Sequence, residues 1–399
     1  MNFKILAYTT PNYPVSENDF DINKVKANNE NFDLGTTFKK FSGEMAGICY
    51  MPHDINALMA QPDEKKFARA NTTMANGHTS VFDHEFVTLY LEDVPKLFAM
   101  LLNNEKQYTT SEKSARYTKM EMQGKELDLY TKWSEKLVGL ISEKYGNEPY
   151  FDERRIQKLA QENARYFLSV YTPTSLAYTT SFRQLNNLYA WLNKIDQNDS
   201  VYLQKLKPTA MSFCEFLQDN GLINKPMVDY ANLRNFSLIA PKDRVEYFGD
   251  VYCISYTGSF AQLAQAQRHR TIAYEMKPLD TDMYYVPKII RENPKLKSEW
   301  LNDMYSIKEV VPQGQMVQIY ERGTPENFVM KLRERLCTCA QLEICDQTKE
   351  NLQKYITNTK DEKIKEMLNY YNKGARCTSG YKCNSPCNFK EGITLKRTI

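Results

Sequence analysis

The amino-acid sequence predicts an α+β protein built from two copies of one domain. Segments with strand-like and helix-like apolar spacing alternate along the chain, and two blocks of this kind recur in the same order. The chain has 399 residues, of which 42% are hydrophobic and 12% aromatic, so it can bury a large core. This length suggests two domains or one domain duplicated, and the recurrence favours a duplication.

The charges of the chain are nearly balanced. Its 52 basic and 49 acidic residues leave a net charge of +3, which supplies no global field to hold a nucleic-acid backbone. The first residues alternate like a strand and lack the long apolar core of a signal peptide, and no apolar run approaches the length of a membrane span. We expect a cytoplasmic protein, of a cell or of a phage-infected host, with neither nucleic acid nor membrane as a partner.

The first recurring block is a strand followed by a helix. In residues 84–106, apolar and polar side chains alternate and then, after Pro95, follow a helical spacing to the end of the block. The second copy repeats this order with a strand over residues 251–256, a break at Gly258 and a helix that ends in the Arg-His-Arg of residues 268–270.

The second recurring block also predicts a strand that leads into a helix. It begins at Leu168 in the first copy and at Val311 in the second. The two blocks lie closer together in the second copy, which therefore lacks about twenty residues, and we assign the loss to part of the helical stretch around residues 125–145. Further helical patterns cover residues 154–170, 202–218 and 349–372. We expect the first copy to span residues 1–220, the second copy residues 221–376, and a cysteine-containing tail residues 377–399.

A basic motif, Gln265-x-x-Arg268-His269-Arg270, follows the helix of the first block in the second copy. It resembles the first half of the signature of flavin-dependent thymidylate synthases, in which Gln-x-x-Arg-His-Arg precedes a Ser-x-Arg loop. The second copy has no such loop after Arg270. The first copy lacks the Arg-His-Arg but contains Ser-Ala-Arg at residues 114–116, within SEKSARY. Each copy therefore keeps the half of the signature that the other has lost.

Further segments resemble the same family. Residues 77–84, GHTSVFDH, are similar to its flavin-contacting segment Gly-His-Glu-Thr-Pro-Phe-Glu-His, although Asp83 replaces a glutamate. Arg165 matches a nucleotide-binding arginine, and Arg335 matches a later one within a gap-free similarity over residues 311–344. Two flavin-binding positions of the family are matched by Arg183 and Asn187, whereas Ser181 replaces an asparagine.

The resemblance implies a fold and a reaction. It implies two synthase-like domains, each with a mixed sheet plus helices. The family methylates dUMP to dTMP with methylenetetrahydrofolate, while FAD carries hydride from NADPH. The resemblance therefore implies FAD as cofactor, and dUMP, folate and NADPH as substrates. Members of the family are tetramers whose dUMP sites lie between subunits, so a chain with two copies is expected to form a homodimer.

The resemblance also assigns roles to residues. Arg268 and Arg335 would be catalytic, because they would face the pyrimidine and stabilise negative charge on its carbonyl without any cysteine nucleophile. The phosphate would be bound by Ser114, Arg116, Arg165 and the Gln265 amide. The full dUMP set is Gln265, Arg268, Glu112, Ser114, Arg116, Arg165 and Arg335. The FAD set is His78, Ser80, Asp83, Arg183, Asn187, Arg268, His269 and Arg270.

Six of the nine cysteines lie after residue 336. In a reducing compartment such crowding favours metal or redox chemistry over disulfides. Cys377, Cys383 and Cys387, with Cys337 or Cys339, suit a four-thiolate zinc or iron–sulfur site, but their spacing matches no standard two-residue knuckle. Free or redox-active thiols are the alternative.

The departures from the signature leave two other functions open. A relative that hydroxymethylates dUMP, or modifies a pyrimidine nucleotide in another way, would need the same phosphate-binding residues. A catalytically silent protein that only binds nucleotide or flavin would need them too. Bound flavin in the purified protein is the observation that would best separate these possibilities.

Overall fold

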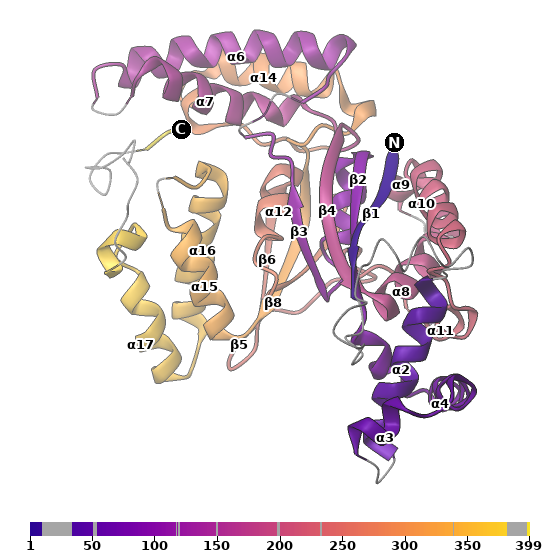
Figure 1. Cartoon of the computed structure of the whole chain (residues 1–399). Helices are drawn as coiled ribbons and strands as arrows, with labels where there is room; N and C mark the ends of the chain where they lie inside the picture. Colours follow the sequence, from indigo (N-terminus) through magenta and orange to yellow (C-terminus); the bar gives the residue numbers. More distant parts are fainter. Residues whose placement is uncertain are drawn as a thin grey trace. The chain divides into compact units, whose positions relative to one another are not determined.

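A computed structural model describes residues 1–9, 34–50, 54–116, 118, 120–148, 151–197, 200–231, 234–337, 339–380 and 397–399. The chain forms two compact units, each of which contains a four-stranded sheet and several helices (Figure 1). Unit 1 consists of residues 1–112 and 174–236, and unit 2 consists of residues 113–173 and 237–399. The predicted α+β class is therefore confirmed. The units are defined by packing, whereas the two expected copies are defined by the repeat, so their boundaries need not coincide.

The sheet of unit 1 has the strand order β1-β2-β4-β3. Its strands are β1 (Asn2–Tyr8), β2 (Phe86–Pro95), β3 (Tyr108–Glu112) and β4 (Pro173–Ser181). β1 pairs antiparallel with β2, and β3 pairs antiparallel with β4. The alternation that predicts β2 is visible in its burial, because Val87, Leu89 and Leu91 are fully buried at every second position.

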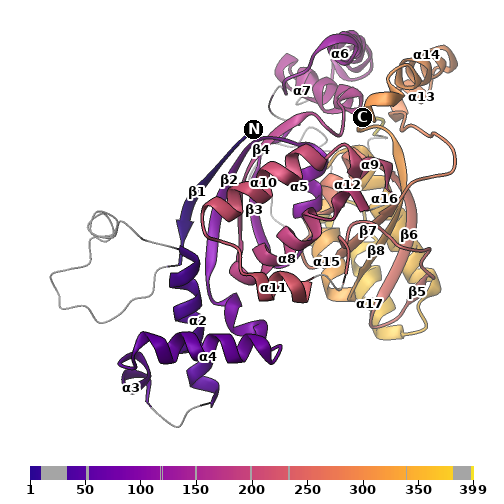
Figure 2. The same ribbon diagram turned by 90° about the vertical axis from the view of Figure 1, so that its right-hand side faces the viewer.

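Helices complete the core of unit 1. They are α2 (Leu34–Tyr50), α3 (Ile55–Met59), α4 (Asp63–Ala75), α5 (Lys96–Leu102), α8 (Phe182–Leu192), α9 (Val201–Gln204), α10 (Lys207–Asp219) and α11 (Lys225–Ala231). Figure 2 shows α11 beside α8, and these two helices pack against each other. Aromatic contacts join the layers, with ring centroids 5.3 Å apart for Phe38 and Phe182 and 5.9 Å apart for Phe98 and Phe213.

The sheet of unit 2 has the order β5-β6-β8-β7 and is antiparallel throughout. Its strands are β5 (Tyr247–Phe248), β6 (Tyr252–Ser259), β7 (Ala273–Lys277) and β8 (Met316–Gly323). The expectation of a mixed sheet is therefore wrong for this unit. Helix α12 (Phe260–Ala266) returns the chain so that β7 runs in the direction of β6, and β8 enters between them in the opposite direction. One isolated parallel bridge, between Ile239 and Met276, adjoins the sheet.

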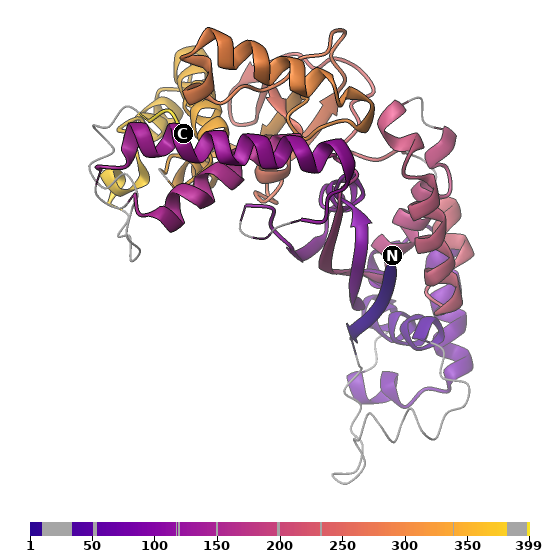
Figure 3. The ribbon, with the colours of Figure 1, turned by 90° about the horizontal axis from the view of Figure 1, so that it is seen from above.

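A helical layer of unit 2 is built around three aromatic side chains. It contains α6 (Gly124–Tyr145), α7 (Glu153–Ala164), α13 (Lys288–Arg291) and α14 (Pro294–Tyr305). Figure 3 shows α6 beside α14. The fully buried Trp133 and Trp300 pack edge-on between these helices, with ring centroids 4.8 Å apart. The ring centroid of Phe167, three residues after the end of α7, lies 4.6 Å from that of Trp300. Lys132 and Asp303 form an ion pair of 2.6 Å at the edge of this cluster.

The remaining helices of unit 2 follow its last strand. α15 (Pro325–Arg335), α16 (Leu342–Asn358) and α17 (Glu362–Tyr371) pack against one another (Figure 1). Among the described parts of the chain, no helix is long and apolar enough to cross a membrane.

From the second strand of each sheet onward, the elements follow one another along the chain in the same order. In each, the second strand leads directly into a helix (α5 or α12) and the fourth strand leads into another (α8 or α15). α5 and α12 both have seven residues, and α8 and α15 both have eleven. The helices between the third and fourth strands differ, because α6 and α7 have 22 and 12 residues whereas α13 and α14 have 4 and 12. The two copies, and the loss of residues from the second copy near the counterpart of residues 125–145, stay a prediction.

Three details of the predicted elements are wrong. Helix α12 ends at Ala266, so residues 268–270 lie on the following turn instead of on the helix. Gly258 lies within β6 and does not break it. A Cβ atom at this position would lie 2.7 Å from Gln262 Oε1 and 3.0 Å from the side chain of Ile319, so the side chain of Gln262 would have to move. The helix predicted to end near residue 106 likewise ends at Leu102.

Candidate functional site

Unit 2 contains both halves of the split signature. The segment 113–173 contributes the Ser-x-Arg loop and Arg165, which we call the first half of the site. The segment 237–399 contributes the Arg-His-Arg motif with Gln265 and Arg335, which we call the second half of the site. The predicted residues that fall in this unit are Ser114, Arg116, Arg165, Gln265, Arg268, His269, Arg270 and Arg335.

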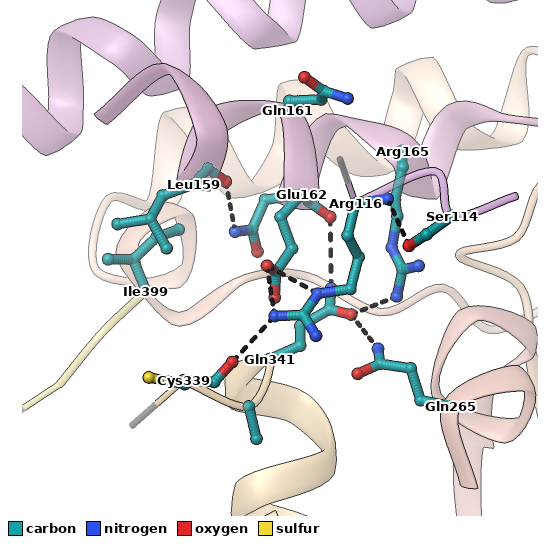
Figure 4. Close-up of polar contacts among 12 residues, drawn as sticks. Ser114, Arg116, Leu159, Gln161, Glu162, Arg165, Gln265, Cys339, Gln341 and Ile399 are labelled. Carbon is teal, nitrogen blue, oxygen red and sulfur yellow. Dashed lines mark hydrogen bonds and ion pairs between the residues drawn. The ribbon is translucent and has the colours of Figure 1, made fainter. Parts of the chain in front are cut away.

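Arg116 lies in the turn that follows β3 and is held by α7. Its Nε and Nη2 atoms donate to the carboxylate of Glu162 over 2.9 Å and 2.8 Å. The same Nη2 atom donates to the carbonyl oxygen of Cys339 over 2.9 Å, so Arg116 lies between two segments of the unit (Figure 4). The amide of Arg116 donates to Ser114 Oγ over 3.4 Å. The serine loop is therefore tied to the segment that follows α15.

Arg165 is buried at the end of α7 and contacts residues of the segment 237–399. Its Nη2 atom donates to the carbonyl oxygen of Ala261 and to Oε1 of Gln341. Gln265, on α12, donates from its Nε2 atom to the same oxygen of Gln341 (Figure 4). One amide oxygen thus accepts from a predicted residue of each half. Burial lowers the pKa of Arg165, but a guanidinium remains protonated in proteins.

Arg335 and His269 form the second contact between predicted residues. Arg335 Nε donates to Nε2 of His269 over 2.8 Å, and its Nη2 donates to the carbonyl oxygen of Gln265 over 3.2 Å. Burial, reinforced by the charges of Arg335 and Lys331, lowers the pKa of His269 to about 2. His269 is therefore a neutral acceptor, and the charge of Arg335 stays available for a ligand.

Arg268 and Arg270 flank His269 on the turn between α12 and β7. The amides of Arg268 and His269 close this turn by donating to the carbonyl oxygens of Gln265 and Ala266 over 3.3 Å and 3.0 Å. Arg268 is exposed and Arg270 is half-buried. The three side chains of the motif therefore lie on this turn and not on helix α12.

A buried carboxylate lies next to Gln341. Glu343 accepts from the amide and hydroxyl of Ser259 over 2.9 Å and 2.7 Å, and from the hydroxyl of Tyr166 over 2.7 Å. Burial raises the pKa of Glu343, while these donors oppose the shift. A cavity of about 480 Å³ beside Glu343 is lined further by Tyr285 and Arg291. None of the residues predicted to bind dUMP or FAD lines this cavity.

A buried ion pair precedes Arg335 by one helical turn. Lys331 Nζ and Glu321 Oε2 lie 2.5 Å apart, and both side chains are fully buried. The hydroxyls of Tyr252 and Tyr256 donate to the two oxygens of Glu321 over 2.9 Å and 3.1 Å. The carboxylate is therefore well satisfied despite its burial.

Unit 1 contains the predicted flavin residues outside the Arg-His-Arg motif. Asp83 ends the short helix η1 (Thr79–Asp83), which packs against α8. Its carboxylate pairs with Arg183 and accepts from the hydroxyl of Ser181 over 2.6 Å. His78 and Ser80 are exposed, and Asn187 lies one turn after Arg183 on α8. These residues thus come from two adjoining elements of the unit.

Glu112 is the last residue of unit 1 and has partners there. It lies 2.5 Å from Lys96 Nζ and accepts from Asn103 and Thr174 over 3.3 Å and 3.4 Å. The structure thus gives this predicted dUMP residue an ion pair and two hydrogen bonds with residues of the sheet and its helix.

The predicted metal ligands are only partly described. Cys383 and Cys387 lie outside the described residues, Cys337 is buried, and Cys339 and Cys377 are exposed. Within the described ranges, no group of three histidine, cysteine or acidic side chains is arranged to hold a metal ion. A hydrogen bond with Cys339 lowers the pKa of the Cys337 thiol to about 6.

Three polar residues of this site were not among the site residues predicted from the sequence. Glu162, Gln341 and Glu343 are all buried and hydrogen-bonded to predicted residues or to their neighbours. Gln341 and Glu343 stand within the gap-free similarity of residues 311–344, in the otherwise apolar run AQLEI. Polar residues in an apolar run were the available signal, because a buried polar side chain needs a partner.

Comparisons with known proteins support the predicted family. A family model described as thymidylate synthase complementing protein matches residues 37–195. Thymidylate synthase X from Helicobacter pylori, solved with FAD and dUMP, shares 14% identity over 59% of this chain and 100% of its own, with a TM-score of 0.33. The UMP/dUMP methylase PolB from Streptomyces cacaoi, bound with 5-Br dUMP, shares 13% identity over 58% of this chain and 93% of its own, with a TM-score of 0.32. A sequence comparison with curated proteins finds no match.

The matched segment includes the GHTSVFDH segment, the SEKSARY loop and Arg165. These are the parts of the expected first copy on which the predicted resemblance depends, and the family model matches the chain there. Over residues 37–195, the chain is similar to the family described as thymidylate synthase complementing protein.

Proposed function

We propose that this protein methylates dUMP to dTMP, with methylenetetrahydrofolate as the one-carbon donor, FAD as cofactor and NADPH as the reductant. One observation carries the proposal beyond the similarity to that family. Arg165, from the first half of the site, and Gln265, from the second half, donate to the same oxygen of Gln341 within unit 2. Two incomplete halves that meet in one folded unit can supply one complete binding site.

The first half of the site suits a phosphate group. Arg116 and Arg165 are guanidinium donors, and Ser114 adds a hydroxyl in the same loop as Arg116. Arg116 has a partner in Glu162, so a phosphate would share or replace that carboxylate. Glu112 remains in the proposed dUMP set because it directly precedes the loop.

The second half suits the pyrimidine. Transfer of hydride to the ring places negative charge on a carbonyl oxygen, and a fixed guanidinium stabilises that charge. Arg335 is fixed by His269 and by the carbonyl oxygen of Gln265, and neither partner carries a negative charge. We therefore assign the catalytic charge stabilisation to Arg335 and to Arg268 beside it in the motif.

The residues of unit 1 fit a flavin. Arg183 and Asn187 lie on one face of α8, since they are four residues apart, and η1 with Asp83 packs against that helix. His78 and Ser80 are exposed at the same element. When bound, FAD would carry hydride from NADPH to the pyrimidine ring. His269 and Arg270 complete the proposed FAD set from the second half.

The proposal includes two copies and a homodimer. Copies at residues 1–220 and 221–376, with a tail at 377–399, are supported by the equal lengths of α5 and α12 and of α8 and α15. The shared strand order of the two sheets supports them as well. If each copy replaces one subunit of a tetramer, two chains restore the assembly. Light scattering at micromolar concentration should then give the mass of a dimer.

The experiment that tests the function starts with the purified full-length protein. We expect the absorbance bands of oxidised flavin and conversion of dUMP to dTMP when methylenetetrahydrofolate and NADPH are supplied. Arg335→Ala should reduce turnover efficiency about tenfold to a thousandfold, as expected for loss of a transition-state donor. Arg333→Ala is the matched control, because Arg333 lies on the same helix, is exposed and contacts Tyr371.

Two outcomes would contradict the proposal. A colourless protein that takes up no added FAD and converts no dUMP would support a catalytically silent scaffold. A yellow protein that consumes dUMP but releases 5-hydroxymethyl-dUMP or another product would support a changed reaction. Both outcomes are read from the same chromatogram and absorbance spectrum.

A further inference from the structure

Gln341 joins the two halves of the candidate site through its amide group. The residue directly precedes α16 and is almost fully buried, with 1% of its surface exposed. Its Nε2 atom donates to the carbonyl oxygen of Glu162 over 3.3 Å and to the hydroxyl of Tyr166 over 2.7 Å. Its Oε1 atom accepts from Arg165 and from Gln265. All the hydrogen-bonding groups of this amide are therefore used within unit 2.

The orientation of the Gln341 amide is determined by partners that act in one way only. A backbone carbonyl, such as that of Glu162, can only accept a hydrogen bond, and a guanidinium, such as that of Arg165, can only donate. The amide nitrogen of Gln341 must therefore face Glu162, and its oxygen must face Arg165. A flipped amide would place two donors and two acceptors against each other.

The orientation of Gln265 follows from that of Gln341. Because Oε1 of Gln341 is an acceptor, Gln265 must turn its NH2 group toward it. The other end of the Gln265 amide, Oε1, is buried and has no hydrogen-bond partner among the described residues. Nε of Arg165 is likewise buried without a partner within those ranges. The site thus retains one unused acceptor and one unused donor.

A buried acceptor without a partner destabilises the protein unless a ligand supplies the donor. A phosphate dianion carries no proton and can only accept hydrogen bonds, so it cannot satisfy Gln265 Oε1. The nucleoside part of a pyrimidine nucleotide does carry donors, namely the imide N–H of the ring and the hydroxyl of the sugar. The geometry therefore assigns the oxygen of the Gln265 amide to a donor of the nucleoside part and not to the phosphate.

We propose that Gln341 is a specificity-determining residue, which holds Gln265 so that its carbonyl oxygen accepts a hydrogen bond from the nucleoside part of the substrate. This inference rests on the proposed function, since it concerns the same nucleotide site. Arg116, Arg165 and Ser114 bind the phosphate, and Gln265 selects a ligand with a donor on its ring or sugar. Gln341 acts through Gln265 and is a positioning residue.

The test measures binding of four probes to the full-length protein by calorimetry. dUMP carries both donors, N3-methyl-dUMP lacks the imide N–H, 2′,3′-dideoxyuridine monophosphate lacks the sugar hydroxyl, and 2-deoxyribose 5-phosphate lacks the base. We expect dUMP to bind at least about tenfold more tightly than the analogue that lacks the donor facing Gln265. The analogue that shows this loss identifies the ring or the sugar as the source.

Two variants of Gln265 decide between the nucleoside and the phosphate. Gln265→Leu should abolish the preference between dUMP and that analogue, and should leave the affinity for 2-deoxyribose 5-phosphate within about twofold of the wild-type value. Gln265→Glu should keep the preference, because a carboxylate still accepts the hydrogen bond. If Gln265 donates to phosphate instead, the glutamate variant repels it, and both variants weaken binding of 2-deoxyribose 5-phosphate as much as binding of dUMP. That result would overturn the inference, and so would equal binding of dUMP and both analogues.

Gln341→Leu tests the positioning role. It should lower the same preference, because the released Gln265 amide can turn its NH2 group toward the ligand. Gln353→Leu is the matched control, since Gln353 is exposed on α16. Gln341 is buried, so thermal unfolding must first show that the variant is folded; if it is not, the two Gln265 variants decide alone.

Failure of the wild-type protein to bind dUMP contradicts the proposed function itself. If the protein binds dUMP but its preference for dUMP over the analogue is unchanged in the Gln265 variants, only this inference is contradicted.

Discussion

Arg335 Nε donates a hydrogen bond to Nε2 of His269 over 2.8 Å. This contact joins the last residue of α15 to the turn after α12, and it requires the imidazole to be neutral, because a protonated ring has no acceptor. The neighbouring charges of Arg335 and Lys331 favour the same state. The pair therefore keeps one guanidinium charged and oriented while its partner contributes no charge.

The first prediction is a loss of stability at mildly acidic pH that depends on His269. Its pKa in the folded protein is about 2, whereas in the unfolded chain it is about 6.5. As the pH falls below about 6.5, the unfolded state takes up a proton that the folded state does not, so stability falls with pH. We expect the free energy of unfolding to fall by about 1 to 2 kcal/mol between pH 7 and pH 5. Partial exposure of the His269 side chain limits the size of this loss.

Denaturant unfolding at each pH measures this effect. His269→Gln keeps an acceptor for Arg335 but does not titrate, so its stability should change less between pH 7 and pH 5 than that of the wild type. His84→Gln, at an exposed position, should behave like the wild type. Parallel pH profiles for the wild type and His269→Gln would contradict the prediction.

The second prediction concerns the buried pair of Lys331 and Glu321. Lys331→Met should destabilise unit 2 by about 3 to 5 kcal/mol, because it leaves a buried carboxylate without its counter-charge. In the proposed alignment of the copies, the first copy has Leu188 and Tyr178 at these two positions, both buried. The double variant Lys331→Leu with Glu321→Tyr copies that pair and should recover most of the loss. Equal destabilisation by the single and double variants would show that the ion pair is not the cause.

The third prediction concerns the C-terminal cysteines. If Cys337, Cys377, Cys383 and Cys387 bind zinc or an iron–sulfur cluster, elemental analysis should find about one metal ion or cluster per chain. Cys383→Ser should lose the metal, while Cys49→Ser, at an exposed position of α2, should keep it. The low pKa of Cys337 supports a thiolate ligand at neutral pH. A folded protein without metal would leave free or redox-active thiols as the explanation.

Local pattern was sufficient to predict the strand-to-helix units. Residues 168–192 and 311–335 both show apolar alternation followed by helical spacing, and the structure places β4 with α8 and β8 with α15 there. The helices begin directly after Ser181 and Thr324, which accept hydrogen bonds from the amides three residues later. These signals are local, so one sequence contains them.

Contacts between distant residues were not available from pattern. The end of α12 at Ala266 depends on a tight turn that the apolar spacing continues through, so the spacing alone predicts a longer helix. Gln341 belongs to the site only because residues 162, 165 and 265 converge on it, and no local spacing encodes that convergence. The resemblance identified Gln265 but not the direction in which its amide points.

The last prediction tests the composite site with two variants and their mixture. Arg116→Ala removes a proposed phosphate ligand and Arg268→Ala a proposed charge stabiliser, so each should reduce turnover efficiency at least about tenfold to a thousandfold. Both residues lie in unit 2 of one chain, and we expect them to serve one site. Refolding or exchanging the two variants together should therefore restore no activity, because every site contains one defect.

Partial recovery of activity in the mixture, toward one intact site in each mixed dimer, would show that the halves come from different chains. Arg155→Ala, on the neighbouring helix α7, controls for the loss of a positive charge nearby. Full activity of Arg116→Ala alone would show that the SEKSARY loop is not part of the nucleotide site.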